Sequence, residues 1–358
     1  MRLLFLLDNY QDDDTTNSIF YRLCQRWAPT RELTMSTIAF GAEGPLMERL
    51  RSLGISARTI PWHGLRDRKA IREEGKRVLY RADRPDLIQS FCRWPDFPAR
   101  YFHSGHPDVP FVTSLHDVDF CNTATRESIL TKVVERVTRK WVDAFVSCSQ
   151  TQQQELRRRG IAPVKIAKIP MGVDGLQCFP ISEGNKERFR SLLGVDKETP
   201  LIVSAGRFVK GNRYDLLLDA MRAVLEKQPE ARLFLVGDGP ERGEVERKIK
   251  SLNIEPAVRI VGHLSAVLPK LFSTADIVVH LAKNEAFSLY LAEAQAAGTA
   301  VVSFDTGSNR EIVRDNETGL LVPEGRPSAL AEALNLLIED WEIREDMGTL
   351  GRDFILEH

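Results

Sequence analysis

The sequence predicts an α/β protein built from two Rossmann-like, doubly wound domains that face each other across a cleft. Short runs of apolar, often β-branched residues alternate with longer segments of helical periodicity, which is typical of parallel α/β architecture. This alternation occurs twice, once in each half of the chain. The length of 358 residues also exceeds that of one ordinary domain. Ligands of open parallel sheets bind beyond the carboxyl ends of the strands, so we expect the site there.

Each expected strand is a short apolar run followed by a segment long enough for a helix. In the first half these strands are 3–7, 36–40, 57–60, 87–90, 111–115, 145–147 and 166–169. In the second half they are 201–204, 232–236, 259–261, 277–280, 300–303 and 320–322. The clearest helix is 215–227, because its apolar side chains recur at helical spacing.

The boundary between the domains is expected where this periodicity lapses. Residues 175–185, directly after Asp174, contain proline, glycine and polar residues that suit a linker. We therefore place an N-terminal domain at 1–180 and a C-terminal domain at 181–358. The end of the chain, 330–358, is expected to be helical throughout, and this terminal helix can pack back on the N-terminal domain.

The composition excludes several classes of function. The 49 Lys and Arg residues nearly balance the 50 Asp and Glu residues. The chain therefore lacks the basic excess of a nucleic-acid-binding protein. The apolar run at 3–7 is too short for a membrane span or a signal peptide. The five cysteines are odd in number and lack CxxC spacing, so we expect reduced thiols in the cytoplasm and no zinc site.

The most informative stretch is 284–298, which follows the strand ending at His280. Glu285 falls in the strand-to-helix loop and Glu293 lies one to two turns into the helix, so both can point toward the carboxyl edge of the sheet. Free N–H groups at the helix start favour anionic or hydroxyl-rich ligands, and carboxylates accept hydrogen bonds from sugar hydroxyls. The alternative is a helix cap and an unrelated surface glutamate.

This stretch resembles the E-x7-E signature of retaining glycosyltransferases of family 4, which have the GT-B fold. Further matching segments in the second half are 205–209, 215–218, 235–240, 275–280, 297–302, 311–313 and 318–322. Weaker matches in the first half are 113–117 and 169–174. The resemblance implies that the first domain binds the acceptor, that the second binds the nucleotide sugar, and that the active site lies in the cleft.

The resemblance implies a hexosyltransferase-like enzyme that moves a sugar from a nucleotide-diphosphate sugar, commonly UDP-linked, to an acceptor hydroxyl with retention of configuration. The acceptor is a saccharide, a lipid-linked sugar or a small molecule, in polysaccharide, glycolipid or natural-product glycoside synthesis. No cofactor besides the nucleotide-sugar substrate is implied. Because no DxD-type motif is convincingly placed, we expect no metal requirement.

A peripheral contact with the inner face of the membrane is considered for the basic segment 66–84, since basic residues favour anionic lipids. Acidic residues interrupt this segment, so a solvated helix of mixed charge is the alternative.

The resemblance assigns catalytic roles to His116, Arg207 and Glu285, and it implies that Glu293 holds the ribose hydroxyls. The other donor-binding positions are Gly206, Lys210, Asn212, Arg213, Gly237, His263, Ala286, Phe287, Ser288 and Leu289. The family favours glycine at 286 and 288, so a methyl and a hydroxymethyl group are expected to narrow the donor pocket.

Arg207 follows a strand and a glycine, where its guanidinium can reach a diphosphate and stabilise the charge of the leaving group. The family pairs this arginine with a lysine at the position of Asn212, and here Lys210 and Arg213 lie on either side. Either a neighbour replaces the lysine or the leaving group is less well neutralised. A solvated loop cation is the alternative for Arg207.

The first half departs further from the family. His116 ends a strand, and the resemblance places it beside the donor sugar, whereas a lone histidine there is otherwise structural. Three aspartates at 12–14 stand where the family has a glycine-rich loop, and they would repel a phosphate. Two other functions therefore stay open: a non-catalytic sugar-nucleotide or glycan-binding subunit, and a GT-B sugar-nucleotide epimerase.

Overall fold

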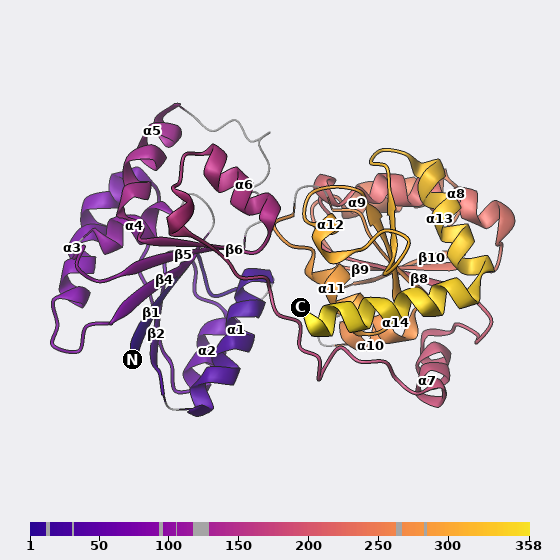
Figure 1. The fold of residues 1–358 in the computed structure, drawn as a ribbon, viewed down its shortest axis with the longest axis horizontal. Coiled ribbons are helices and arrows are strands. Elements are labelled where there is room, and N and C mark those ends of the chain that lie inside the picture. Colours follow the sequence, from indigo (N-terminus) through magenta and orange to yellow (C-terminus); the bar gives the residue numbers. More distant parts are fainter. Residues whose placement is uncertain are drawn as a thin grey trace. The chain divides into compact units, whose positions relative to one another are not determined.

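In a computed structural model the chain forms two units, Met1–Pro170 and Met171–His358. The structure describes residues 1–11, 15–30, 32–92, 96–104, 106–116, 129–262, 267–282 and 285–358. Each unit consists of a parallel sheet with helices packed on its two faces (Figure 1).

The first unit alternates strands and helices along the chain. Its strands are β1 (Arg2–Leu7), β2 (Thr34–Ala39), β3 (Ser56–Thr59), β4 (Leu87–Phe91), β5 (Phe111–Leu115), β6 (Ala144–Ser147) and β7 (Ile166–Lys168). Its helices are α1 (Thr15–Trp27), α2 (Pro45–Ser52), α3 (Arg68–Leu79), α4 (Phe97–His103), α5 (Ile129–Thr138) and α6 (Gln150–Arg158). Within the described ranges the sheet order is β3-β2-β1-β4-β5-β6-β7, and all pairs are parallel.

The second unit repeats this pattern. Its strands are β8 (Leu201–Ala205), β9 (Arg232–Val236), β10 (Val258–Gly262), β11 (Ile277–His280), β12 (Ala300–Phe304) and β13 (Leu320–Val322). Its helices are α7 (Glu183–Leu193), α8 (Tyr214–Lys227), α9 (Arg242–Ser251), α10 (Leu268–Thr274), α11 (Leu289–Ala296), α12 (Asn309–Ile312), α13 (Pro327–Glu339) and α14 (Trp341–Glu357). The described strands follow the parallel order β10-β9-β8-β11-β12-β13, the order of a Rossmann sheet.

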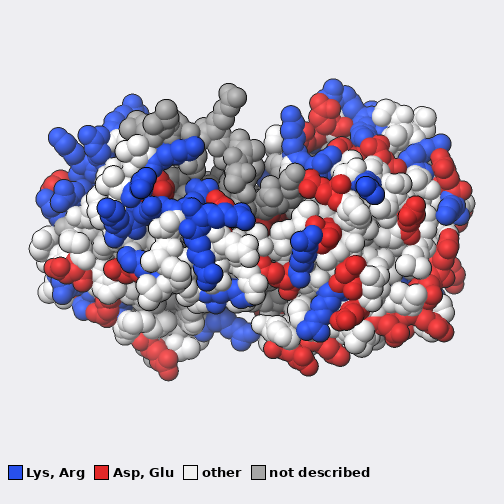
Figure 2. All heavy atoms as spheres, turned by 45° about the horizontal axis from the view of Figure 1, so that its top comes forward, with Lys and Arg blue, Asp and Glu red and all other residues white. Residues whose placement is uncertain are grey.

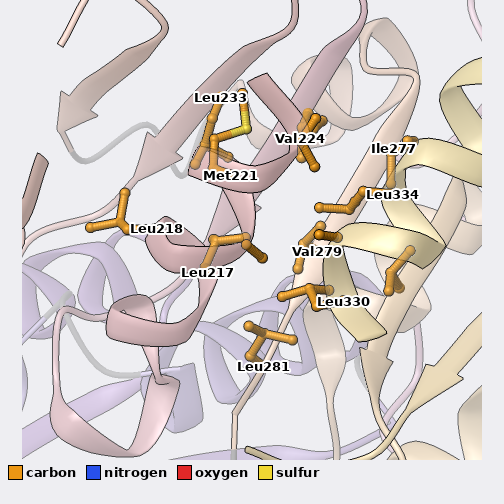
Figure 3. Packing of buried hydrophobic residues seen from close by; sticks show 14 of the residues in the cluster. Leu217, Leu218, Met221, Val224, Leu233, Ile277, Val279, Leu281, Leu330 and Leu334 are labelled. Carbon is orange, nitrogen blue, oxygen red and sulfur yellow. The ribbon is translucent and has the colours of Figure 1, made fainter. Parts of the chain in front are cut away.

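The second sheet is held by apolar side chains on both of its faces. On one face, Leu217 and Met221 of α8 and Leu334 of α13 pack with Val279 of β11, as Figure 3 shows. A separate cluster on the other face includes Leu291 of α11 and strand residues of β8 and β12. Burying one such side chain contributes about 1.5–3 kcal/mol, so the two clusters fix the strands that carry the site.

The predicted fold class is confirmed, and every predicted strand is present with ends that differ by at most two residues. The prediction of one continuous helix over 330–358 is wrong. The chain breaks between α13 and α14 at Asp340, whose side chain accepts a hydrogen bond of 3.0 Å from the backbone N–H of Ile343. Asp340 is thus an N-cap that begins a new helix.

Residues 171–180, which the sequence analysis assigned to the first domain, belong to the second unit. Ser273 donates a hydrogen bond of 2.8 Å to the carbonyl oxygen of Phe179, and Arg352 donates one of 3.3 Å to that of Cys178. These contacts attach this segment to α10 and α14 of its own unit.

Candidate functional site

The second sheet reverses its strand order between β8 and β11. The chain runs outward from β8 to β9 and β10, and then returns to add β11 on the other side of β8. In doubly wound sheets ligands bind beyond the carboxyl ends of the strands at this switch point. The loop beginning at Gly206 follows β8, and the loop containing Glu285 follows β11. The topology therefore places both predicted motifs at the ligand-binding edge of one sheet.

Gly206 and Gly237 bring the loops after β8 and β9 into backbone contact. Gly237 has a φ of +145°, and a Cβ atom there would lie 2.0 Å from the carbonyl oxygen of Gly206. Gly206 has a φ of +149° and donates its N–H to the carbonyl oxygen of Val236 at 3.0 Å. Both the positive φ angle and the lack of space exclude a side chain at Gly237, so the peptide backbone itself lines this part of the candidate site.

The loop after β8 separates its cations into two kinds. Arg213 forms two hydrogen bonds with the Asp215 carboxylate, at 3.0 and 2.9 Å, so its guanidinium is already paired. Asn212 donates a hydrogen bond of 2.7 Å to the carbonyl oxygen of Arg207 and so closes the loop. The exposed side chains of Arg207 and Lys210 form no hydrogen bond or ion pair with any residue that the structure describes. These two cations are available to an anionic ligand.

Glu285 is fixed by three neighbours in the second unit. Its Oε2 atom accepts a hydrogen bond of 2.8 Å from the Ser288 hydroxyl and lies 2.9 Å from Nε2 of His280. Its carbonyl oxygen accepts a hydrogen bond of 2.9 Å from the Ser308 hydroxyl. The Ser288 hydroxyl, expected to narrow a donor pocket, is fully buried and bound to Glu285.

His280 is the residue of the candidate site that sequence reasoning did not select. Besides its contact with Glu285, its Nδ1 atom lies 3.1 Å from the carbonyl oxygen of Ala205, the last residue of β8. Burial lowers the pKa of His280, but the charge of Glu285 and the hydrogen bonds outweigh it and raise the pKa above its ordinary value. The signal available in the sequence was a histidine at a strand end, five residues before a motif glutamate.

Glu293 lies inside α11, where its side chain is buried. At the start of this helix, Leu289 donates its N–H to the carbonyl oxygen of Phe287 at 3.1 Å. The N–H groups of Phe287 and Ser288 donate to none of the described residues; Phe287 is partly exposed, whereas Ser288 is buried. Ala286 is buried beside them.

His116 follows β5 in the first unit. Its ring stacks on Phe91 with centroids 5.0 Å apart, and its Nδ1 atom lies 3.3 Å from the Cys148 sulfur. Burial lowers the pKa of His116 to about 4, so the imidazole is neutral at pH 7. His263 and the aspartates at 12–14 lie outside the described residues.

The described part of the chain holds no group of three or more His, Cys, Asp or Glu side chains that could bind a metal ion. Among its helices, none combines the length and apolar character that crossing a bilayer requires.

Two Rossmann-like units and a polar cluster at the switch point of the second define a protein of the GT-B class. Two family models match nearly the whole chain between them. The model described as "Glycosyltransferase Family 4" matches residues 18–175, and that described as "Glycosyl transferases group 1" matches residues 185–354. The chain belongs to glycosyltransferase family 4.

Individual proteins agree with this assignment. The D-inositol 3-phosphate glycosyltransferase of Jonesia denitrificans is 31% identical over 284 residues, which cover 73% of this chain and 65% of the relative. The alpha-D-kanosaminyltransferase of Streptomyces kanamyceticus is 23% identical over 297 residues, which cover 79% of this chain and 73% of the relative. The chain thus spans slightly less than two thirds of the first relative's length.

The fold also matches that of HepE from Anabaena in complex with UDP and glucose. The TM-score is 0.84 at 20% identity, and the match covers 100% of this chain and 95% of that chain.

Proposed function

We propose that this protein is a retaining glycosyltransferase that moves a sugar from a UDP-linked nucleotide-diphosphate sugar to an acceptor hydroxyl. The observation that carries this proposal is the grouping of free cations, free backbone N–H groups and Glu285 around the switch point of the second sheet. Family membership supports it, as do the relatives named for glycosyl transfer and the structures of HepE with UDP and glucose or with UDP-glucose.

The cations are suited to a diphosphate leaving group. Negative charge develops on the diphosphate as the glycosidic bond breaks, and a fixed guanidinium stabilises that charge. Arg207 is free for this role, and Lys210 is the free cation near Asn212, the position where the family has lysine. Because Arg213 is paired with Asp215, we assign the second positive charge to Lys210 rather than Arg213.

The carboxylates are suited to the two sugars of the donor. In this proposal the free oxygen of Glu285 accepts from hydroxyls of the transferred sugar, and Glu293 accepts from the ribose hydroxyls. The N–H group of Phe287, a partly exposed residue, faces the diphosphate or the sugar hydroxyls. His116, neutral at pH 7, can accept or donate a hydrogen bond at the acceptor-side domain.

A turnover assay with a panel of nucleotide sugars tests the proposal. With a saccharide or glycolipid acceptor, we expect release of UDP together with a glycosylated product of retained anomeric configuration. Nucleotide release at background level with every donor would favour a binding subunit. An isomerised nucleotide sugar formed without acceptor would favour an epimerase. An unchanged rate in the presence of a chelator is expected, and loss of transfer would contradict the metal-independent reaction.

We further propose a peripheral contact between the first unit and an anionic membrane surface. Residues 1–170 contain 27 Lys and Arg against 20 Asp and Glu, whereas residues 171–358 contain 22 against 30. Figure 2 shows Lys and Arg gathered on the visible face of the first unit and mixed with acidic residues on the second. On α5, the exposed Val133 and Val137 lie one turn apart and are flanked by the exposed Lys132 and Arg136.

This surface differs from the segment 66–84 considered from the sequence. On α3, Lys76 and Arg77 are paired with Glu73 and Glu74, which lowers their attraction for lipid. We expect cosedimentation with phosphatidylcholine vesicles that contain phosphatidylglycerol, and none with phosphatidylcholine alone. Replacing Val133 and Val137 with Asp should abolish it, and undiminished cosedimentation of that variant would contradict the assignment to α5.

A further inference from the structure

The imidazole of His280 joins the two loops of the candidate site. It is 2% exposed and lies between the carbonyl oxygen of Ala205, 3.1 Å from Nδ1, and the Glu285 carboxylate, 2.9 Å from Nε2. A carbonyl oxygen and an ionised carboxylate can only accept hydrogen bonds. Both contacts are satisfied when the ring is an imidazolium with an N–H group at each nitrogen.

The two oxygens of the Glu285 carboxylate have different surroundings. Oε2 is held by Ser288 and His280, whereas Oε1 makes no hydrogen bond with any described residue. The side chain is 12% exposed, so Oε1 is the oxygen that can meet a ligand hydroxyl. Fixing Oε2 therefore sets the direction in which Oε1 is presented.

We propose that His280 is a positioning residue that fixes the Glu285 carboxylate and directs its free oxygen to the donor sugar. This inference rests on the proposed function. By binding Ala205 as well, His280 ties that carboxylate to the end of β8, next to Gly206 and the loop assigned to the diphosphate. Its positive charge also offsets repulsion between the carboxylate and the diphosphate.

The pH dependence of this arrangement follows from the groups that face the ring. Among the described residues these include Glu285 from its loop and Tyr290 of α11, whose ring centroid lies 5.4 Å away. Tyr214 of α8 lies close by, since its hydroxyl and the His280 ring both border Gly206, whose carbonyl oxygen accepts from that hydroxyl at 3.0 Å. Burial raises the pKa of Tyr214, so it stays uncharged. When His280 loses one proton at high pH, the neutral ring keeps a single N–H group, so only one of its two contacts retains a donor and its positive charge is lost. Donor affinity should fall as the pH rises through the raised pKa of His280.

Two substitutions separate the two contacts of the ring. In His280→Gln the side-chain amide nitrogen can reach the position of Nε2, and in His280→Asn it can reach that of Nδ1. We expect His280→Asn to raise the KM for UDP-glucose about tenfold or more, with a smaller change in kcat. His280→Gln should recover most of that loss and should remove the decline in affinity at high pH. His63→Gln, an exposed histidine of the first unit, is the matched control and should match the wild type.

The inference is overturned if His280→Asn keeps the wild-type KM, or if His280→Gln keeps the decline at high pH. NMR titration of the His280 ring in the free protein gives a readout that needs neither turnover nor the folding of a His280 variant. Its midpoint should fall in Glu285→Gln, because the charge that raises the pKa of His280 is removed. An unchanged midpoint would refute the pairing. A wild-type protein that cleaves no nucleotide sugar, yet shows this shift in midpoint, would refute the proposed function alone.

Discussion

The two sheets share the strand order around their switch points, yet the loops that follow their first strands differ. In the second unit, Gly206 and Gly237 have positive φ angles and leave backbone and free cations at the edge of the sheet. In the first unit, the described residues around the end of β1 are held by hydrogen bonds within that unit. Asn17 donates to the carbonyl oxygen of Gln11 at 2.9 Å, and Tyr10 is fully buried against Thr37.

This difference indicates that the sheet topology alone does not create a nucleotide-binding site. Both sheets provide the same edge, but a diphosphate can approach closely where glycine removes a side chain and where cations stay unpaired. In the described residues, the second unit offers Gly206 with the unpaired Arg207 and Lys210. By contrast, Asn9 and Gln11 after β1 take part in hydrogen bonds within the first unit. We therefore propose that the donor binds to the second unit, and the following changes test this proposal.

The largest effect is expected for Glu293→Ala in the second unit. Two hydrogen bonds from ribose hydroxyls to a carboxylate would be lost, at about 1.5–3 kcal/mol each, so UDP-glucose should bind at least about 100-fold more weakly. Isothermal titration calorimetry measures this change. Glu332→Ala, an exposed glutamate on α13, is the control and should bind as the wild type does. Unchanged affinity in Glu293→Ala would remove this residue from the site.

The next largest effect is expected for the cations of the loop after β8. Arg207→Ala should raise the barrier by about 3–4 kcal/mol and so lower kcat by about 100- to 1000-fold. Lys210→Ala should lower kcat by about tenfold. Arg213→Ala should lower kcat by less than about threefold, because the Arg213 guanidinium is already paired with Asp215. Steady-state kinetics with saturating donor gives these values. A larger loss in Arg213→Ala than in Lys210→Ala would reverse the assignment.

A smaller effect, on stability, is expected where backbone lines the site. Gly237→Ala places a methyl group against the carbonyl oxygen of Gly206 at a positive φ, and should destabilise the protein by about 2 kcal/mol or more. Gly243→Ala is the matched control, because this glycine lies in α9 with open space around it, and should stabilise by about 0.4–1 kcal/mol. Urea unfolding distinguishes them, and equal midpoints would show that the contact with Gly206 is unimportant.

The smallest effect concerns the first unit. In the folded protein the pKa of His116 is about 4, so the ring stays neutral until the pH falls to that value. In the unfolded chain its pKa is about 6.5. The unfolded state therefore binds more protons between these values, and stability falls as the pH drops from 7 to 5. Between pH 7 and pH 5, the free energy of unfolding of His116→Gln should fall by about 1–2 kcal/mol less than that of the wild type, as measured by urea unfolding at both pH values. An equal loss would contradict the burial of a neutral imidazole.

Sequence reasoning recovered the strands because a continuous run of apolar, β-branched residues is a local signal. It also predicted Glu285 and Glu293 as site residues, which the structure places after β11 and in α11, and their roles stay a prediction. It missed the break at Asp340, where an N-cap residue interrupts an otherwise helical pattern. It could not choose between Lys210 and Arg213, because that choice depends on an ion pair with Asp215. The role that we propose for His280 depends on its contact with Ala205, 75 residues earlier, and such a contact has no local signal.

Amide hydrogen exchange with and without UDP-glucose tests most directly whether the donor binds at the switch point of the second sheet. We predict added protection at residues 206–209, 237–239 and 285–293, with no comparable change in the loop after β1. Protection centred on the first unit, or none in these three segments at saturating UDP-glucose, would contradict the account.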